Sequence, residues 1–123
     1  MNRSRLERLA DLLRGVATRR GPDEHFDLDL WYDEGTCGTT ACAVGWACLD
    51  PWFNDQGLML NRDTIFEDPQ FGELRQWEAV CAFFGISQGQ AEHLFFYLSY
   101  AANERRNPLA VVARIEGMLG GAV

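Results

Sequence analysis

The longest uncharged run in the sequence, Gly35 to Leu49, places the strongest constraint on the fold. It has 15 residues, fewer than the ~18 apolar residues that suggest a bilayer-spanning helix, so no membrane span is predicted. Thr39 or Thr40 can serve as an N-cap and Asp50-Pro51 as a stop signal, which together predict a helix from about Thr40 to Leu49. Because no side of this helix carries charge, we expect it to be surrounded by protein at the centre of the domain.

Gly45 and Trp46 indicate how this central helix packs. A glycine inside a helix costs about 0.5–1 kcal/mol relative to alanine, so Gly45 needs a structural reason. Ala41 lies four residues earlier on the same face, and we expect the backbone of a neighbouring helix to approach both residues. Trp46 is expected to fill the space between the apolar stripes of the later helices.

Apolar residues recur at helical spacing in the rest of the chain, which predicts one mainly helical domain spanning residues 1–123. The fold class is mainly α, or α+β with minor β. It comprises four or five helices around the small-residue central helix and one short β element near residues 26–32 or 57–66. The other helices are expected in a basic amphipathic segment within residues 1–21 and near residues 74–84, 87–102 and 108–119.

Charge is unevenly distributed along the chain, whose net charge is -7. Residues 1–20 hold six arginines and two acids, or +4, and the remainder holds five arginines and sixteen acids, or -11. We expect the basic first helix to lie against the acidic segment at residues 23–29. An acidic chain without lysine repels a polyanion, so nucleic acid is an unlikely partner.

Three of the four cysteines lie in the stretch CGTTACAVGWAC, residues 37–48. A structural zinc site uses four converging ligands, commonly from close pairs such as C-x2-C. Cys37 and Cys42 are five residues apart, and Cys42 and Cys48 would point about 120° apart on a helix. This spacing argues against shared ligation, although His25 or His93 could join a zinc site. We therefore predict no metal and no cofactor.

A second interpretation makes Cys37 a nucleophile. A cysteine just before a helix N-terminus has a lowered pKa because of the unpaired N–H groups and the helix dipole. His93, or less favourably His25, would act as the base of a thiol-dependent hydrolase or transferase. A third interpretation, which we favour, treats the whole stretch as core packing, because a free cysteine usually behaves as a small buried apolar residue.

The cysteine stretch also carries a resemblance. The chain resembles a family of small uncharacterised bacterial and phage-associated proteins that share a C-G-T-x-x-C-x-x-G-W segment. The resemblance covers about residues 26–119 and continues through Phe84-Gly85-Ile86-Ser87 to the last helix. It implies a shared fold, and the family has no assigned activity and therefore no site to transfer. The residues that match the segment are Cys37, Gly38, Thr39, Cys42, Gly45 and Trp46.

The N-terminus alternates charged and apolar residues and lacks the features of a secretory signal, which predicts a cytoplasmic protein with reduced thiols. In the absence of recognisable catalytic spacing, we expect a protein-binding or accessory domain without catalytic activity. The aromatic Phe95-Phe96-Tyr97 region is the expected interface, with a homodimer or an unidentified protein as partner. The enzyme based on Cys37 is the alternative, and an acidic mimic of nucleic acid that blocks a DNA-binding protein is a weaker one.

Overall fold

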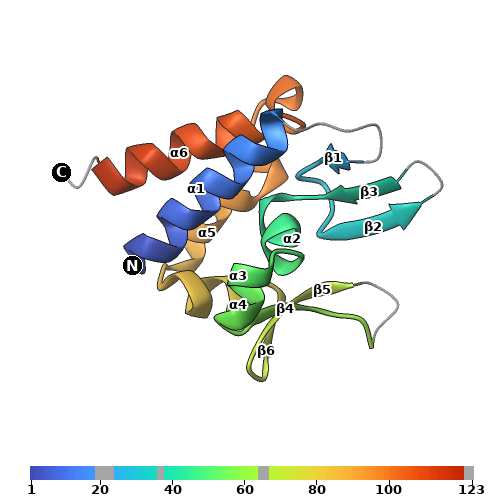
Figure 1. Cartoon of the computed structure of the whole chain (residues 1–123). Helices are drawn as coiled ribbons and strands as arrows, with labels where there is room; N and C mark the ends of the chain where they lie inside the picture. Colours follow the sequence, from blue (N-terminus) through green and yellow to red (C-terminus); the bar gives the residue numbers. More distant parts are fainter. Residues whose placement is uncertain (19–23, 36–37, 64–66, 121–123) are drawn as a thin grey trace.

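The computed structural model describes residues 1–18, 24–35, 38–63 and 67–120 (Figure 1). Within these ranges the chain forms α-helices, two short 3₁₀ helices and two small sheets. The α-helices are α1 (Arg3–Thr18), α2 (Ala43–Cys48), α3 (Pro51–Asp55), α4 (Gln76–Phe84), α5 (Gln88–Phe95) and α6 (Pro108–Gly120). The 3₁₀ helices are η1 (Tyr97–Ser99) and η2 (Ala102–Glu104).

Each of the two sheets has three strands. In the first, β3 lies between β1, to which it is parallel, and β2, to which it is antiparallel. In the second, β5 lies between β4 and β6 and is antiparallel to both. The strands are β1 (Glu24–Phe26), β2 (Tyr32–Gly35), β3 (Gly38–Ala41), β4 (Leu58–Asn61), β5 (Asp68–Phe71) and β6 (Leu74–Arg75).

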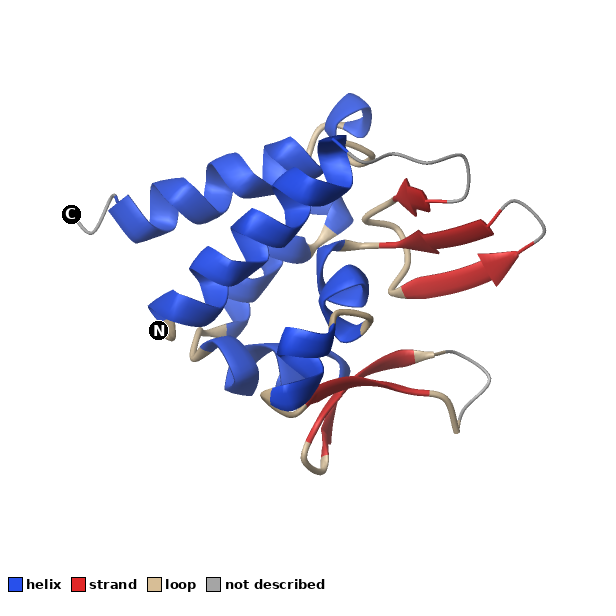
Figure 2. Ribbon diagram, viewed as in Figure 1, coloured by secondary structure: helices blue, strands red, loops and turns tan. Residues whose placement is uncertain are grey.

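The long helices α1 and α6 pack against each other on one side of the molecule, and the strands lie on the other side (Figure 2). The apolar stripe of α1 is fully buried at Leu6, Leu9 and Leu13, which confirms the helix expected in residues 1–21 as far as it is described. The compact mixture of helices and small sheets agrees with an α+β fold.

The prediction of one short β element is wrong, because the described residues contain two sheets. The region near residues 26–32, where a β element was expected, is not one strand: β1 ends at Phe26 and β2 begins at Tyr32. Between them, the Asp27 carboxylate accepts a hydrogen bond from the Asp29 backbone N–H at 3.0 Å. An aspartate that bonds the backbone two residues ahead stabilises a turn, and this turn interrupts the extended chain.

The number of helices is also larger than the expected four or five, since six α-helices occur in the described part of the chain. Asp50-Pro51 does not only stop a helix; it also starts α3. The Asp50 side chain accepts a hydrogen bond from the Trp52 N–H at 3.1 Å, and Pro51 occupies the first helical position, where its missing N–H has no cost.

The helix in the uncharged run is shorter than predicted, and neither Thr39 nor Thr40 caps it. Both threonines belong to β3, and the N-cap of α2 is Cys42, whose Sγ accepts the Gly45 N–H at 3.3 Å. The α2 residues Ala43, Val44 and Ala47 are fully buried. Residues 38–41 form a strand and not the start of the helix, because they pair with β1 on one side and with β2 on the other.

A backbone does approach Gly45, but it does not belong to a helix. A Cβ built on Gly45 would overlap the backbone carbonyl oxygen of Trp31, in the connection between β1 and β2. Trp46 also departs from expectation: it is half-buried rather than central, and its indole N–H donates to the His25 carbonyl at 3.0 Å. The small residues of α2 thus accommodate the chain leading into β2.

The basic first helix is not neutralised by residues 23–29 as far as these are described. Arg14 pairs with Asp11 at 2.8 Å and with Glu116 of α6 at 3.0 Å. Arg3 donates to the Leu119 carbonyl, also in α6, at 2.9 Å. The charges of α1 therefore support its packing against α6. Arg19 and Arg20 lie outside the described residues.

Candidate binding pocket

Two of the cysteines are part of the core. Both Cys42, the N-cap of α2, and Cys48, the last residue of α2, are buried. Burial raises the pKa of the Cys42 thiol to about 11, although the backbone N–H groups around Gly45 act in the opposite direction. Burial likewise raises the pKa of Cys48. Both thiols are therefore protonated at neutral pH, so neither is a nucleophile.

Cys37 itself lies outside the described residues. The helix N-terminus on which its nucleophilic interpretation depended is displaced, because α2 begins only at Ala43 and β3 intervenes. The proposed bases are both exposed: His25 in β1 and His93 in α5. In Figure 1, β3 begins at the end of its sheet that lies away from α5, the helix that carries His93.

Two further absences concern only the described ranges. Their histidines, cysteines and acids form no group of three or more that could hold a metal ion. Each helix in these ranges is too short or too polar to cross a membrane.

The cysteine environments lead to a first prediction. At pH 8, iodoacetamide should leave Cys42 and Cys48 unmodified in the folded protein and modify half-exposed Cys81 slowly, because burial and Glu92 raise the pKa of the Cys81 thiol. Mass spectrometry of the alkylated peptides measures this, and the same protein in urea is the control in which all thiols react. Rapid modification of Cys42 in the folded protein would contradict its assignment to the core.

Burial of the Cys42 thiol also makes the stability of the folded protein depend on pH. The pKa of Cys42 is higher in the folded protein than its ordinary value of 9.0. Its contribution to stability is therefore complete below pH 9 and is lost as the pH rises from 9 toward 11, because the unfolded chain ionises first. Urea unfolding should therefore give a lower free energy of unfolding at pH 10.5 than at pH 8.

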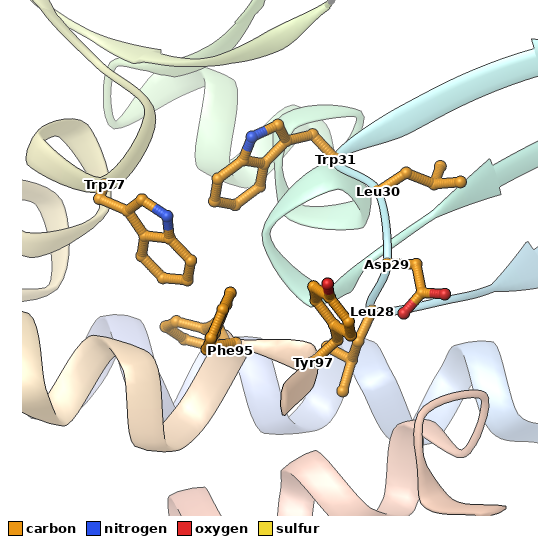
Figure 3. Close-up of a pocket in the computed structure, with 8 residues that line it drawn as sticks. Leu28, Asp29, Leu30, Trp31, Trp77, Phe95 and Tyr97 are labelled. Atoms are coloured by element: carbon orange, nitrogen blue, oxygen red, sulfur yellow. The ribbon is translucent and has the colours of Figure 1, made fainter. Parts of the chain in front are cut away.

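The described residues form a pocket of about 150 Å³ walled by aromatic rings (Figure 3). Three segments build it: the turn between β1 and β2, the first turn of α4, and the end of α5 with the start of η1. In Figure 3 the rings of Trp31, Trp77, Phe95 and Tyr97 surround it, while the Asp29 and Leu30 side chains point away from the two tryptophans. The lining residues are Leu28, Asp29, Leu30, Trp31, Trp77, Phe95, Phe96 and Tyr97.

The rings of this pocket touch one another edge to face. The Trp31 and Trp77 centroids are 5.1 Å apart with planes at 63°, and those of Trp77 and Phe96 are 6.1 Å apart at 76°. Phe96 and Tyr97 follow at 5.2 Å and 63°. Edge-to-face packing is the favoured arrangement of aromatic pairs, and it turns successive ring faces in different directions around the pocket.

A buried carboxylate fixes the position of Trp77. Asp68 of β5 is buried and accepts hydrogen bonds from Arg75 at 2.9 and 3.1 Å and from the Gln76 side chain at 3.0 Å. Gln76 has a φ of 53°, a left-handed conformation that is uncommon for a residue other than glycine. The interaction with Asp68 holds this conformation at the start of α4, immediately before Trp77.

Other hydrogen bonds fix the opposite walls. The Ser99 hydroxyl donates to the Phe96 carbonyl at 2.8 Å, and Arg105 Nε donates to the Tyr97 carbonyl at 2.9 Å. These bonds satisfy carbonyls after α5, so the helix stops at Phe95 instead of continuing to residue 102 as expected. The Leu28 N–H donates to the Arg105 carbonyl at 3.0 Å, which ties the β1–β2 turn to the same region.

Sequence reasoning identified only one wall of this pocket, the Phe95-Phe96-Tyr97 region. Neither Trp31, within the β element expected near residues 26–32, nor Trp77, within the helix expected near residues 74–84, was a site candidate. The sequence signal for Trp31 was weak: it is a bulky aromatic residue among acidic ones, in a stretch where a polar residue would be usual at an exposed position. The contact between Trp31 and Trp77 depends on the turn at Asp27 and on the start of α4.

With the geometry established, we compared the chain with known proteins. Protein-family models, curated proteins and solved structures returned no match.

Proposed function

We propose that this chain is a protein-binding module and that the aromatic pocket receives one side chain of its partner. The volume of about 150 Å³ carries the proposal, because small-molecule sites occupy about 300–1,000 Å³ whereas one side chain needs less. Tryptophan, tyrosine and phenylalanine are enriched at protein interfaces, and anchoring side chains enter such pockets. Leu98, which follows the lining residue Tyr97 in η1, is 59% exposed.

Several further proposals accompany this function. We propose that the protein acts in the cytoplasm, without catalysis and without a cofactor, and that α2 is the helix around which the others are arranged. The partner is a second copy of the chain or another protein, and nucleic acid is not expected. The buried thiols of Cys42 and Cys48 support packing as the role of these two cysteines.

Site-specific photocrosslinking tests the proposal. We would replace Leu98 with benzoylphenylalanine and irradiate the protein in native lysate, using the same replacement at Leu109, which is 49% exposed on α6, as the matched control. We expect a crosslinked product from position 98 alone, which disappears when Trp77→Ala is added. Light scattering of the purified protein determines whether the partner is a second copy.

Two outcomes would contradict the proposal. One is an identical set of products from positions 98 and 109, because the contacts would then be nonspecific. The other is a product from position 98 that survives Trp77→Ala in a variant shown by urea unfolding to be folded, because the pocket would then play no part in binding.

A further inference from the structure

Arginines cover many of the aromatic rings of this protein. Cation–π contacts of this kind attract a positive charge to the face of a ring. Four half-buried rings have an arginine guanidinium 5.2–5.6 Å from the ring centroid. These rings are Tyr32, Trp52, Phe71 and Tyr97.

The remaining pocket rings differ in this respect. Trp31, Trp77 and Phe96 are half-buried, and within the described ranges no arginine lies over any of them. Arg105 covers Tyr97 at 5.3 Å, so the half-buried pocket rings without an arginine over them are those of the two tryptophans and Phe96. A cation from outside the chain would find its most favourable aromatic surface there.

We propose that the group received by the pocket is an alkylated ammonium, carried by a methylated lysine of the partner. This proposal rests on the protein-binding function proposed above. An unmodified lysine ammonium has three N–H donors that require acceptors. The side chains that line the pocket are aromatic or aliphatic except Asp29, whose carboxylate points away from the two tryptophans (Figure 3). A trimethylated ammonium keeps its positive charge without N–H donors, so ring faces alone can satisfy it.

The electrostatic surroundings support a cation in one respect and oppose it in another. The chain carries a net charge of -7, and exposed Asp29 forms no ion pair among the described residues. Asp29 lines the pocket, and its carboxylate points away from the tryptophans (Figure 3), so it attracts a cation toward the pocket without facing the two indole rings. Arg105, which lies over the Tyr97 ring at 5.3 Å from its centroid, opposes the cation, and we therefore expect millimolar affinity for a small probe.

Choline and its neutral isostere 3,3-dimethylbutan-1-ol provide the test, because they share size and shape and differ in charge. The indole N–H signals of the four tryptophans would be followed by NMR during each titration. We expect choline to bind about tenfold more tightly than the isostere and to shift the signals of Trp31 and Trp77, with Trp46 and Trp52 as internal controls. Trp77→Leu should abolish the shift, and Asp29→Asn should weaken binding about twofold.

A short peptide with one trimethyllysine separates the two possible sources of the cation. Tighter binding of this peptide than of free choline supports a partner side chain, and tighter binding of choline overturns that assignment. Equal binding of choline and the isostere would overturn the cation proposal. The protein-binding function would still stand in that case if the crosslink from position 98 is lost with Trp77→Ala; if the crosslink persists, the function itself fails.

Discussion

Gly45→Ala is expected to destabilise the protein by about 3 kcal/mol or more, at the upper end of the cost of overpacking a core. The added methyl group would overlap the Trp31 carbonyl oxygen and would lie 2.9 Å from the Ala41 Cβ. Neither neighbour can move easily. The Cys42 N–H donates to the Leu30 carbonyl at 3.1 Å, which ties the chain before Trp31 to the start of α2. Urea unfolding of the variant and the wild type measures the difference.

Gly117→Ala is the matched control for this prediction. Gly117 also lies in a helix, α6, but a Cβ there would meet nothing within 4 Å. We expect Gly117→Ala to stabilise the protein by about 0.5–1 kcal/mol, because alanine loses less backbone entropy in a helix than glycine. Equal unfolding midpoints for Gly45→Ala and the wild type would show that the contact with Trp31 does not determine the packing of α2.

The same glycine shows what the sequence could predict and what it could not. A glycine inside a predicted helix indicates that a backbone comes close, and one does, although it belongs to the β1–β2 connection and not to a neighbouring helix as expected. Sequence periodicity could not identify which backbone, because Trp31 is 14 positions away and its approach depends on the Asp27 turn. The helices were predictable because their apolar residues repeat at regular spacing along the sequence. The turn was not predictable, because it depends on a single hydrogen bond of the Asp27 carboxylate and leaves no repeating pattern.

The candidate site likewise has one part that the sequence indicated and one part that it did not. The Phe95-Phe96-Tyr97 wall was visible as an aromatic cluster along the chain. Trp31 and Trp77 are 46 positions apart and meet through two local features, the turn before β2 and the left-handed Gln76. The cysteine stretch attracted attention because it is unusual in sequence, but its described cysteines are buried. An unusual composition here reflects tight packing, whereas the pocket consists of ordinary residues brought together by turns.

The position of Trp77 depends on the buried carboxylate of Asp68, and this leads to the last prediction. Asp68→Ala should destabilise the protein by about 1.5–3 kcal/mol, because it removes the buried carboxylate that accepts hydrogen bonds from Arg75 and Gln76. Part of the cost is recovered by water, since the Arg75 side chain is 37% exposed. Glu73→Ala, an exposed acid in the β5–β6 turn, is the control and should change stability by less than about 0.5 kcal/mol.

The Asp68 variant also separates stability from the geometry of the pocket. Without the carboxylate, nothing else described holds the Gln76 side chain, and its left-handed backbone should relax. The indole signal of Trp77 should then shift and broaden in the folded protein at low temperature, while that of Trp52, on α3, should stay unchanged. Asp68→Asn, which keeps one carbonyl acceptor, should lose less stability and retain a sharper Trp77 signal. If Asp68→Ala lowers stability but leaves the Trp77 signal unaltered, the carboxylate supports the hairpin alone and other contacts position the pocket wall.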